Sequence, residues 1–269
     1  MKITGKACGG PLGLEIAGFR CVFKSDFHGI ISVMGRRYGR FRTNKSAEHV
    51  FEAVPAAGRQ NPFKPAVELR GSRLTLERGD FRADLDLKTG LGGLRAAPNE
   101  QCLDAFLRSL ISSLLLRSGG FMLHSAGIVK GGKAYIFLGK SGAGKSTLSK
   151  LAAAAGAGVV SDEINLLRHE SGKFRVYGSP FWGEMRSDGR PGAWPLGGIF
   201  LLKKAKKNRL APCSKPEALK LLLRCLVNFD PSPAAAEKVI GNSARLLSKA
   251  AFSRLEFSKE NAGFLELIR

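Results

Sequence analysis

The first third of the chain alternates between apolar and polar residues in short runs that glycine interrupts. From Arg73 to Leu87, leucine and phenylalanine alternate with charged residues around Arg78-Gly79-Asp80, a pattern typical of a β-hairpin. The segment 29–42 predicts a second strand pair around Gly35. The proline in "AAPNE" then ends the alternation. Residues 1–97 are therefore expected to form a small β-rich module.

The period changes beyond residue 98. Between Leu103 and Leu115 apolar side chains recur every three or four positions, which predicts an amphipathic helix that Gly119-Gly120 ends. Two apolar runs follow, "FMLHSAGIV" and "KAYIFLG", and the turn Lys130-Gly131-Gly132 between them predicts a hairpin. Residues 98–269 are expected to form a second domain of α/β class with a mixed sheet.

Further elements are expected downstream. A short alanine-rich helix over 147–155 precedes strands at "VVSDEINLL", "KFRVYGSPFW" and "GGIFLLKKA". Ser214 and Glu217 have the spacing of a helix cap, with Pro216 in the first turn. A second helix over 234–250, a strand at "RLEFSK" and a short terminal helix complete the expected order.

Composition places the chain among ordinary globular proteins. Its 269 residues are 44% hydrophobic, and no window approaches the run of about 18 apolar residues that a membrane span requires. A cytoplasmic location is the default expectation, with no membrane partner. The cysteines lie far apart, without the spacing of zinc or redox motifs, and are expected to be reduced and structural; they are Cys8, Cys21, Cys102, Cys213 and Cys225.

The formal net charge of +21 favours anionic partners of any kind. The densest basic runs, at 35–45 and 203–209, carry no nucleic-acid fold signature. Solvated turns and strand edges are the favoured interpretation of these runs, and nucleic acid is not the expected partner.

The segment "GKSGAGKS" fits the phosphate-binding pattern G-x-x-x-x-G-K-[S/T], after an apolar strand and before a helix. Glycines let backbone N–H groups turn toward phosphate oxygens at the positive end of the helix dipole. Lys145 can neutralise the β- and γ-phosphates of a nucleotide, and the Ser146 hydroxyl can ligate magnesium. The expected nucleotide-binding residues are Gly139, Lys140, Ser141, Gly142, Ala143, Gly144, Lys145, Ser146 and Thr147.

An acidic pair follows the phosphate-binding loop closely. Asp162 stands seventeen positions after Lys145, which leaves room for one helix, one turn and one strand. That compact unit is expected to place Asp162 and Glu163 near the γ-phosphate and its metal ion. His124 interrupts the apolar strand before the loop strand. It is either a hydrogen-bonded core residue or a group that reaches the phosphate end of the neighbouring strand.

The spaced set of His124, "GKSGAGKST" and Asp162-Glu163 resembles the C-terminal catalytic domain of HPr serine kinase/phosphorylase, whose nucleotide-binding fold is similar to that of phosphoenolpyruvate carboxykinase. "GSPFWGEM" and "PLGGIFLLKKA" resemble the diverged HPr-kinase-related proteins. The resemblance covers roughly residues 120–269. The segment 1–97 does not resemble the regulatory domain of the family, and the glycine-rich signature tied to phosphorolysis is not identified.

The resemblance implies an ATP- and Mg²⁺-dependent kinase that phosphorylates a serine hydroxyl of a protein or peptide, and the net charge would suit an acidic one. By position, Asp162 is implied to accept the hydroxyl proton, and Ser146, Asp162 and Glu163 to hold magnesium. His124 and Lys145 are implied to be catalytic residues near the transferred phosphate, and because HPr kinases are hexamers the resemblance allows for a homo-oligomer. Two alternatives remain: a kinase for a small metabolite such as free serine, and a nucleotide-binding regulatory or scaffold protein. Pyrophosphate is an alternative donor to ATP.

Overall fold

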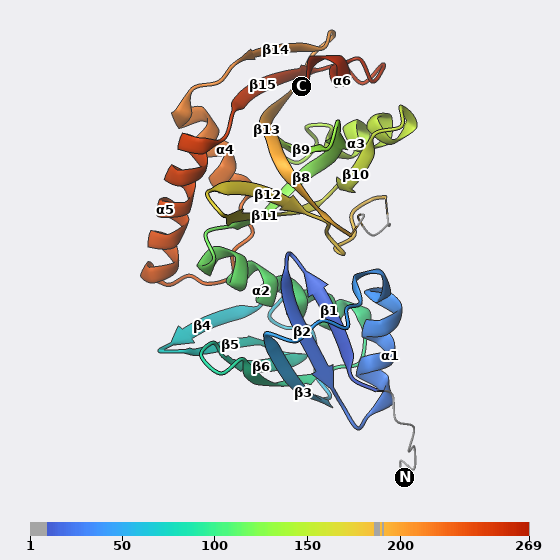
Figure 1. Ribbon diagram of the computed structural model, residues 1–269, viewed down its shortest axis with the longest axis vertical. Helices are drawn as coiled ribbons and strands as arrows, with labels where there is room; N and C mark the ends of the chain where they lie inside the picture. The colour runs from blue at the N-terminus through green and yellow to red at the C-terminus, as the bar shows by residue number, and fades with distance from the viewer. Residues whose placement is uncertain (1–9, 186–188, 190, 269) are drawn as a thin grey trace. The chain divides into compact units, whose positions relative to one another are not determined.

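The computed structural model describes residues 10–185, 189 and 191–268 (Figure 1). Within them the protein is of mixed α/β class, with two mixed β-sheets of seven and eight strands and six α-helices. Contacts divide the chain into two compact units. The first holds the described residues up to Leu114 together with Asn228–Ser232, and the second holds Leu115–Val227 and the described residues from Pro233. Sequence alone placed the boundary after residue 97, whereas residues 98–114 contact the N-terminal sheet.

The first unit contains the seven-stranded sheet, in the order β1-β2-β3-β7-β6-β5-β4. The expected hairpin is confirmed, because Arg78 pairs with Phe81 and leaves Gly79-Asp80 as a two-residue turn. The strands are β1 (Leu12–Ile16), β2 (Phe19–Lys24), β3 (His49–Pro55), β4 (Ala66–Arg70), β5 (Arg73–Arg78), β6 (Phe81–Asp86) and β7 (Leu91–Ala96).

The strand pair expected around Gly35 is wrong. Helix α1 spans His28–Arg37, and a short 3-10 turn at Gly39–Phe41 follows. Its buried residues are Ile30, Ile31, Val33, Met34 and Arg37, a spacing that fits one helical face better than alternate faces of a strand. The isoleucine and valine residues favour strands, but burial of this face decides the structure.

Helix α2 (Glu100–Arg117) confirms the predicted amphipathic helix, and its Phe106 packs against the sheet. The Phe106 ring meets the rings of Phe23, Phe51 and Phe81 edge-on, with centroids 6.1, 5.7 and 5.9 Å away. Edge-to-face contacts of this kind add stability beyond the buried area.

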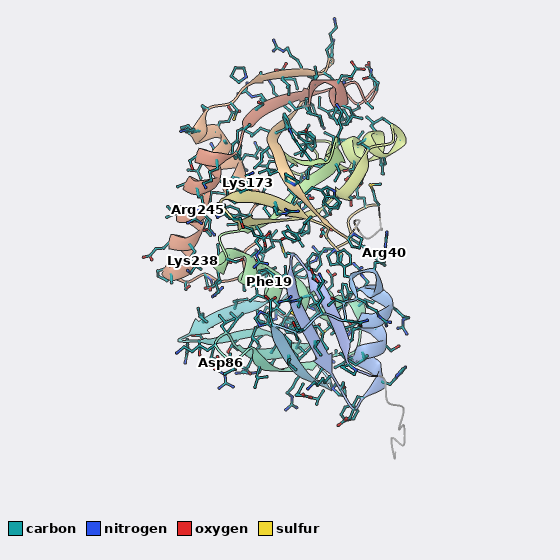
Figure 2. All side chains as sticks on the ribbon, viewed as in Figure 1. Phe19, Arg40, Asp86, Lys173, Lys238 and Arg245 are labelled. Carbon is teal, nitrogen blue, oxygen red and sulfur yellow. The ribbon has the colours of Figure 1, made fainter. Side chains whose placement is uncertain are left out.

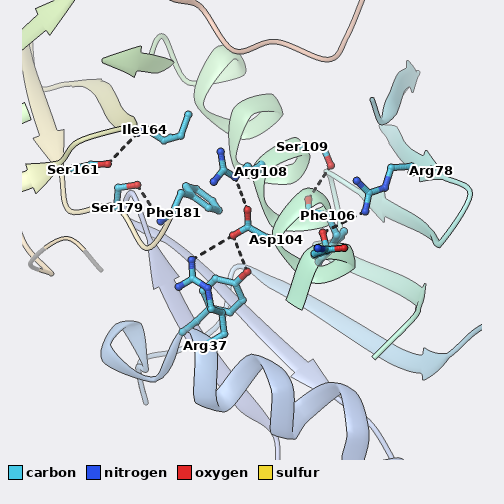
Figure 3. Close-up of polar contacts among 12 residues, drawn as sticks. Arg37, Arg78, Asp104, Phe106, Arg108, Ser109, Ser161, Ile164, Ser179 and Phe181 are labelled. Carbon is cyan, nitrogen blue, oxygen red and sulfur yellow. Dashed lines mark hydrogen bonds and ion pairs between the residues drawn. The ribbon is translucent and has the colours of Figure 1, made fainter. Parts of the chain in front are cut away.

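Asp104 of α2 joins this helix to α1 (Figure 3). Its carboxylate accepts a hydrogen bond from the Tyr38 hydroxyl at 3.2 Å and lies 3.6 Å from the guanidinium of buried Arg37. Arg108 donates to the second carboxylate oxygen. Burial and the charge of Asp104 raise the pKa of Tyr38 well above its usual value, so the phenol stays a donor.

The second unit contains the eight-stranded sheet, in the order β10-β8-β11-β12-β13-β15-β14, with β9 paired to β8 and β13. The elements are β8 (Phe121–Lys130), β9 (Lys133–Leu138), α3 (Lys145–Ala154), β10 (Gly158–Ser161), β11 (Ile164–Glu170), β12 (Lys173–Tyr177), β13 (Ala193–Lys204), β14 (Arg209–Pro212), α4 (Lys215–Cys225), α5 (Pro233–Lys249), β15 (Phe252–Phe257) and α6 (Phe264–Leu267).

Several expectations for this unit are confirmed. The β8–β9 hairpin forms around Gly131 and Gly132, which both have positive φ. The Ser214 hydroxyl caps α4 by accepting a hydrogen bond from the Glu217 amide at 3.3 Å. The single strand expected at "VVSDEINLL" is instead two strands, β10 and β11, with Asp162-Glu163 between them.

Helices cover both faces of this sheet, α4 and α5 on one side and α3 and α6 on the other (Figure 1). Leu222 and Leu246 belong to the first apolar cluster, and Leu148 and Phe264 to the second. Strands buried on both faces explain why the sequence of β8 and β9 is almost continuously apolar.

The described cysteines are all free thiols, and Cys21, Cys102 and Cys225 are buried. Cys8 lies outside the described residues. No helix in the described part of the chain is long and apolar enough to span a membrane.

Breaking the buried ion pair at the β5–β6 turn should destabilise the first unit. Arg78 and Asp80 form two hydrogen bonds of 2.7 Å, and their side chains are 3% and 6% exposed. Asp80→Asn should lower the free energy of unfolding by about 3 kcal/mol, because it leaves a buried guanidinium without its counter-charge. Urea denaturation followed by circular dichroism measures this.

Glu68→Gln is the matched control, because it removes the carboxylate of the exposed Arg70–Glu68 pair in the same sheet. We expect no measurable change for this variant. Equal effects of the two substitutions would contradict the importance given to the buried pair.

Candidate functional site

The loop between β9 and α3 has the backbone shape that a phosphate requires. Gly142 and Gly144 have backbone φ values of 73° and 103°, which residues other than glycine rarely adopt. Gly144 is the N-cap of α3, and no side chain caps the helix there. The first N–H groups of α3 therefore remain available to an anion at the positive end of the helix dipole.

Lys145 is buried within its own loop. Its ammonium donates hydrogen bonds to the carbonyl oxygens of Gly139 at 3.0 Å and Lys140 at 3.3 Å. Burial lowers the pKa of Lys145, and the neighbouring Cys225 and Glu184 oppose this shift. A desolvated cation at this point interacts strongly with an arriving phosphate.

His124 lies on β8 at the point where the pairing of this strand with β9 ends. Along one edge of β8, His124 pairs with Ile164 of β11, and the pairing continues into β10. Along the other edge, Ser125 pairs with Leu138, the last residue of β9. The His124 side chain is exposed although its neighbours in β8 are buried. The alternative that His124 is a core residue is therefore wrong. It stands beside the first residue of the phosphate-binding loop.

The acidic pair occupies a tight turn between β10 and β11. The Ser161 hydroxyl accepts hydrogen bonds from the amides of Glu163 at 3.2 Å and Ile164 at 3.0 Å, the second of which is drawn in Figure 3. The Ser125 amide donates to the Glu163 carbonyl at 2.8 Å. These bonds fix the backbone on both sides of Asp162, whose side chain is 6% exposed.

Asn165 connects the His124 strand to the acidic turn. Its side-chain nitrogen donates to the Ser125 carbonyl at 2.7 Å and to the Ser161 carbonyl at 3.4 Å, and it also lies 3.1 Å from the Ser125 hydroxyl. Asn165 is fully buried and packs against Gly127. A side chain at position 127 would clash with it, because a Cβ there would lie 2.0 Å from Asn165 Oδ1. One amide thus sets the spacing between the residue after His124 and the residue before Asp162.

The four consecutive residues 182–185 were not predicted as part of the site. The Met185 amide donates to Asp162 Oδ2 at 3.1 Å, and a Cβ on Gly183 would lie 2.5 Å from Asp162 Oδ1. Trp182 and Glu184 line the same cleft. The signal in the sequence was a glycine inside an aromatic and acidic run, "FWGEM", where only a residue without a side chain allows such close approach.

These groups line one cleft of about 560 Å³. This volume is within the range of sites that hold small ligands. The cleft brings together most of the predicted residues, together with Lys259, which was not predicted. Gly139 is buried, and neither it, Lys140 nor Ala143 is among the lining residues. The predicted residues that line the cleft are His124, Ser141, Gly142, Gly144, Lys145, Ser146, Thr147, Asp162 and Glu163.

The chemistry of the lining groups fits a magnesium–nucleotide complex. A hydroxyl on Ser146 and carboxylates on Asp162 and Glu163 are hard oxygen ligands of the kind that Mg²⁺ takes alongside substrate phosphates. Among the described residues, no group of three or more His, Cys, Asp and Glu side chains converges as a metal cage. The Mg²⁺ ion in such sites is commonly held by one or two carboxylates and the phosphates themselves.

Comparisons with known proteins add no further assignment. Neither the family models nor the curated proteins searched contain a match to this chain.

Asn165→Ala should lower the free energy of unfolding by about 2–3 kcal/mol, because it leaves buried acceptors at Ser125 and Ser161 without a donor. Thermal and urea denaturation measure the loss. Asn261→Ala is the matched control: the Asn261 side chain is exposed and bonds the Gly263 amide at 2.9 Å. We expect the control to change stability by roughly 1 kcal/mol or less. An effect of Asn165→Ala no larger than the control would contradict the role given to Asn165.

Nucleotide affinity should fall as pH rises into the range in which Lys145 loses its proton, which begins at lower pH than for an ordinary lysine. The lowered pKa of Lys145 means that its charge is lost at a lower pH than the ordinary lysine value of about 10.4. Bound phosphates favour the charged form, so binding in this window should also take up protons. Calorimetric titration of ATP in buffers of different ionisation enthalpy measures both effects. Lys145→Arg is the control, because arginine stays charged throughout; a similar decline with this variant would assign the effect to another group.

Proposed function

We propose that the chain is an ATP- and Mg²⁺-dependent kinase that transfers the γ-phosphate to a serine hydroxyl of a protein or peptide. One observation carries the proposal: a single cleft is lined by the phosphate-binding loop, by Asp162 and by His124. A loop alone would support nucleotide binding only. A carboxylate and an imidazole beside that loop add groups able to position and deprotonate a hydroxyl.

The proposed transfer is an in-line displacement. Asp162 accepts the proton of the serine hydroxyl, whose oxygen forms a bond to the γ-phosphorus as the bond to the β-phosphate oxygen breaks and ADP leaves. Lys145 and the amides at the start of α3 stabilise the negative charge on the phosphate oxygens. His124 lies within the cleft to bind the transferred group. Bound Mg²⁺, held by Ser146 with Asp162 or Glu163, would neutralise phosphate charge.

The contacts that fix the Asp162 carboxylate support its proposed role in this transfer. Its Oδ2 atom accepts the Met185 amide, and Gly183 lies against the carboxylate. A base fixed by its surroundings keeps the acceptor hydroxyl aligned with the γ-phosphorus, which lowers the entropic barrier of the reaction.

The resemblance to HPr serine kinase, with a nucleotide-binding fold like that of phosphoenolpyruvate carboxykinase, agrees with this reading of the site. The phosphate-loop strand β9 lies between β8, which runs antiparallel to it, and β13, which runs parallel to it. The smaller β-rich N-terminal module, a homo-oligomer and a cytoplasmic location belong to the same proposal.

Two other functions remain as candidates. A kinase for a small metabolite such as free serine would use the same loop and Asp162. A nucleotide-binding regulatory protein would use the loop without turnover. Three acidic groups line the cleft, Asp162, Glu163 and Glu184, and they favour chemistry over simple binding.

Asp162→Asn should reduce transfer of radiolabelled γ-phosphate by about 10²- to 10⁴-fold, the usual contribution of a general base. ATP affinity should change little, because the loop and Lys145 remain. Glu237→Gln, on the exposed face of α5, is the control and should retain full activity.

Parallel assays with serine peptides, free serine and no acceptor separate the three candidates. Transfer to peptides supports the proposal, and transfer to free serine alone supports the metabolite kinase. Binding of ATP without turnover toward any acceptor would favour the regulatory protein. Undiminished transfer by Asp162→Asn would remove Asp162 from the mechanism.

A further inference from the structure

A second pocket of about 370 Å³ includes Lys140 of the phosphate-binding loop, and five of its nine lining residues are cations. We call it the basic pocket. Leucine side chains from β13 and α4 form its apolar surface. Its cationic residues are Lys140 of the loop, Lys203 of β13, Lys220 and Arg224 of α4, and Arg254 of β15.

Two of these cations have partners within the chain. Arg254 makes a two-pronged contact with Glu217, at 2.8 Å to one carboxylate oxygen and 2.7 Å to the other. Lys203 lies 3.7 Å from Glu256. The Arg254–Glu217 pair joins β15 to α4 and holds the wall of the basic pocket in place.

The other three cations have no carboxylate partner. Lys140, Lys220 and Arg224 make no ion pair with any residue in the described part of the chain, and all three side chains are exposed. Lys220 and Arg224 are also four positions apart on α4, where like charges destabilise a helix. Glu217, which also lines the pocket, pairs with Arg254, and Glu256 pairs with Lys203, so three of the five cations at this concave surface have no carboxylate partner within the described residues.

The position of Lys140 links the basic pocket to the cleft. Lys140 lines the basic pocket, and the next residue, Ser141, lines the cleft that holds Asp162. A chain molecule lying across the loop can thus occupy both. A serine in the cleft would place residues near it in sequence beside the three unpaired cations.

We propose that the basic pocket binds carboxylate side chains of the acceptor, so that the substrate is a peptide segment whose serine is neighboured by aspartate or glutamate. This inference rests on the proposed kinase function and names its substrate class. Arg224 presents a planar fork that matches a carboxylate, and the leucines accept the methylene groups of acidic side chains.

Other anions fit the basic pocket less well. Single-stranded nucleic acid binds through aromatic stacking platforms, and no aromatic residue lines this pocket in the described structure. A free phosphate ion would leave the leucines uncovered. Carboxylates on a peptide use both the cations and the apolar surface.

The test measures binding independently of transfer. The probe is a fluorescent peptide with alanine in place of the acceptor serine and glutamates around it, and its affinity is measured by anisotropy with a non-hydrolysable ATP analogue and Mg²⁺ present. The double variant Lys220→Glu/Arg224→Glu should weaken binding at least tenfold. The milder Lys220→Gln/Arg224→Gln should lie between it and the wild type.

The double variant Lys173→Glu/Lys238→Glu changes net charge by the same amount on other elements of the same unit, and both positions are labelled in Figure 2. It should bind the peptide within twofold of the wild type. A loss equal to that of the α4 variant would show only the attraction of the whole positively charged protein, and would overturn the proposal.

Three further results test the proposal. Equal binding of the glutamate peptide and its glutamine counterpart by wild type would overturn the acidic substrate class while leaving the kinase function intact. Displacement of the peptide by inorganic phosphate or an oligonucleotide at lower concentration than by unlabelled peptide would reassign the basic pocket. ATP binding is measured separately. Its absence would contradict the proposed kinase function and not only the acidic substrate class.

Discussion

The arrangement of the site depends on one buried amide. Asn165 donates hydrogen bonds to both the strand that carries His124 and the turn that carries Asp162. These two segments are separated by more than thirty residues of chain, which include the phosphate-binding loop and α3. A backbone hydrogen bond from the Ser125 amide to the Glu163 carbonyl joins the same segments, and such directional bonds restrict their spacing more than dispersion does. Gly127 provides the space that Asn165 fills.

The end of β9 gives this amide its importance. β8 pairs with β11 and β10 along one edge, and along the other edge it pairs with β9 only from Ser125 onward. The side chain of His124 is exposed beside the point where β9 ends and the loop begins. Openings of this kind at the ends of strands are where α/β proteins bind ligands.

Much of this fold follows from local signals in the sequence. The β5–β6 hairpin, helix α2 and the Ser214 cap each depend on residues close together in the chain, and each was predicted. Helix α1 was missed because β-branched residues and glycine resemble a strand, and only burial of one face against the sheet selects the helix. The break at Asp162-Glu163 was missed because it depends on the Ser161 hydroxyl capturing two amides.

The residues of the candidate site also fall into a group that the sequence predicted and a group that only the structure shows. The loop and the acidic pair that follows it could be identified as candidates from the sequence, because the phosphate-binding pattern specifies residue types at fixed spacing. Trp182, Glu184 and Lys259 reach the cleft from distant parts of the chain. No spacing rule connects them to the loop, so only the folded structure places them there.

The hydrogen bonds of Lys145 to its own loop bear on how quickly the site can be occupied. The ammonium already holds the carbonyls of Gly139 and Lys140 together, so the loop has its curved shape before any ligand arrives. A phosphate then needs only to redirect one side chain, and little backbone entropy is lost on binding. Association of the nucleotide should accordingly be limited by diffusion into the cleft rather than by slow ordering of the loop.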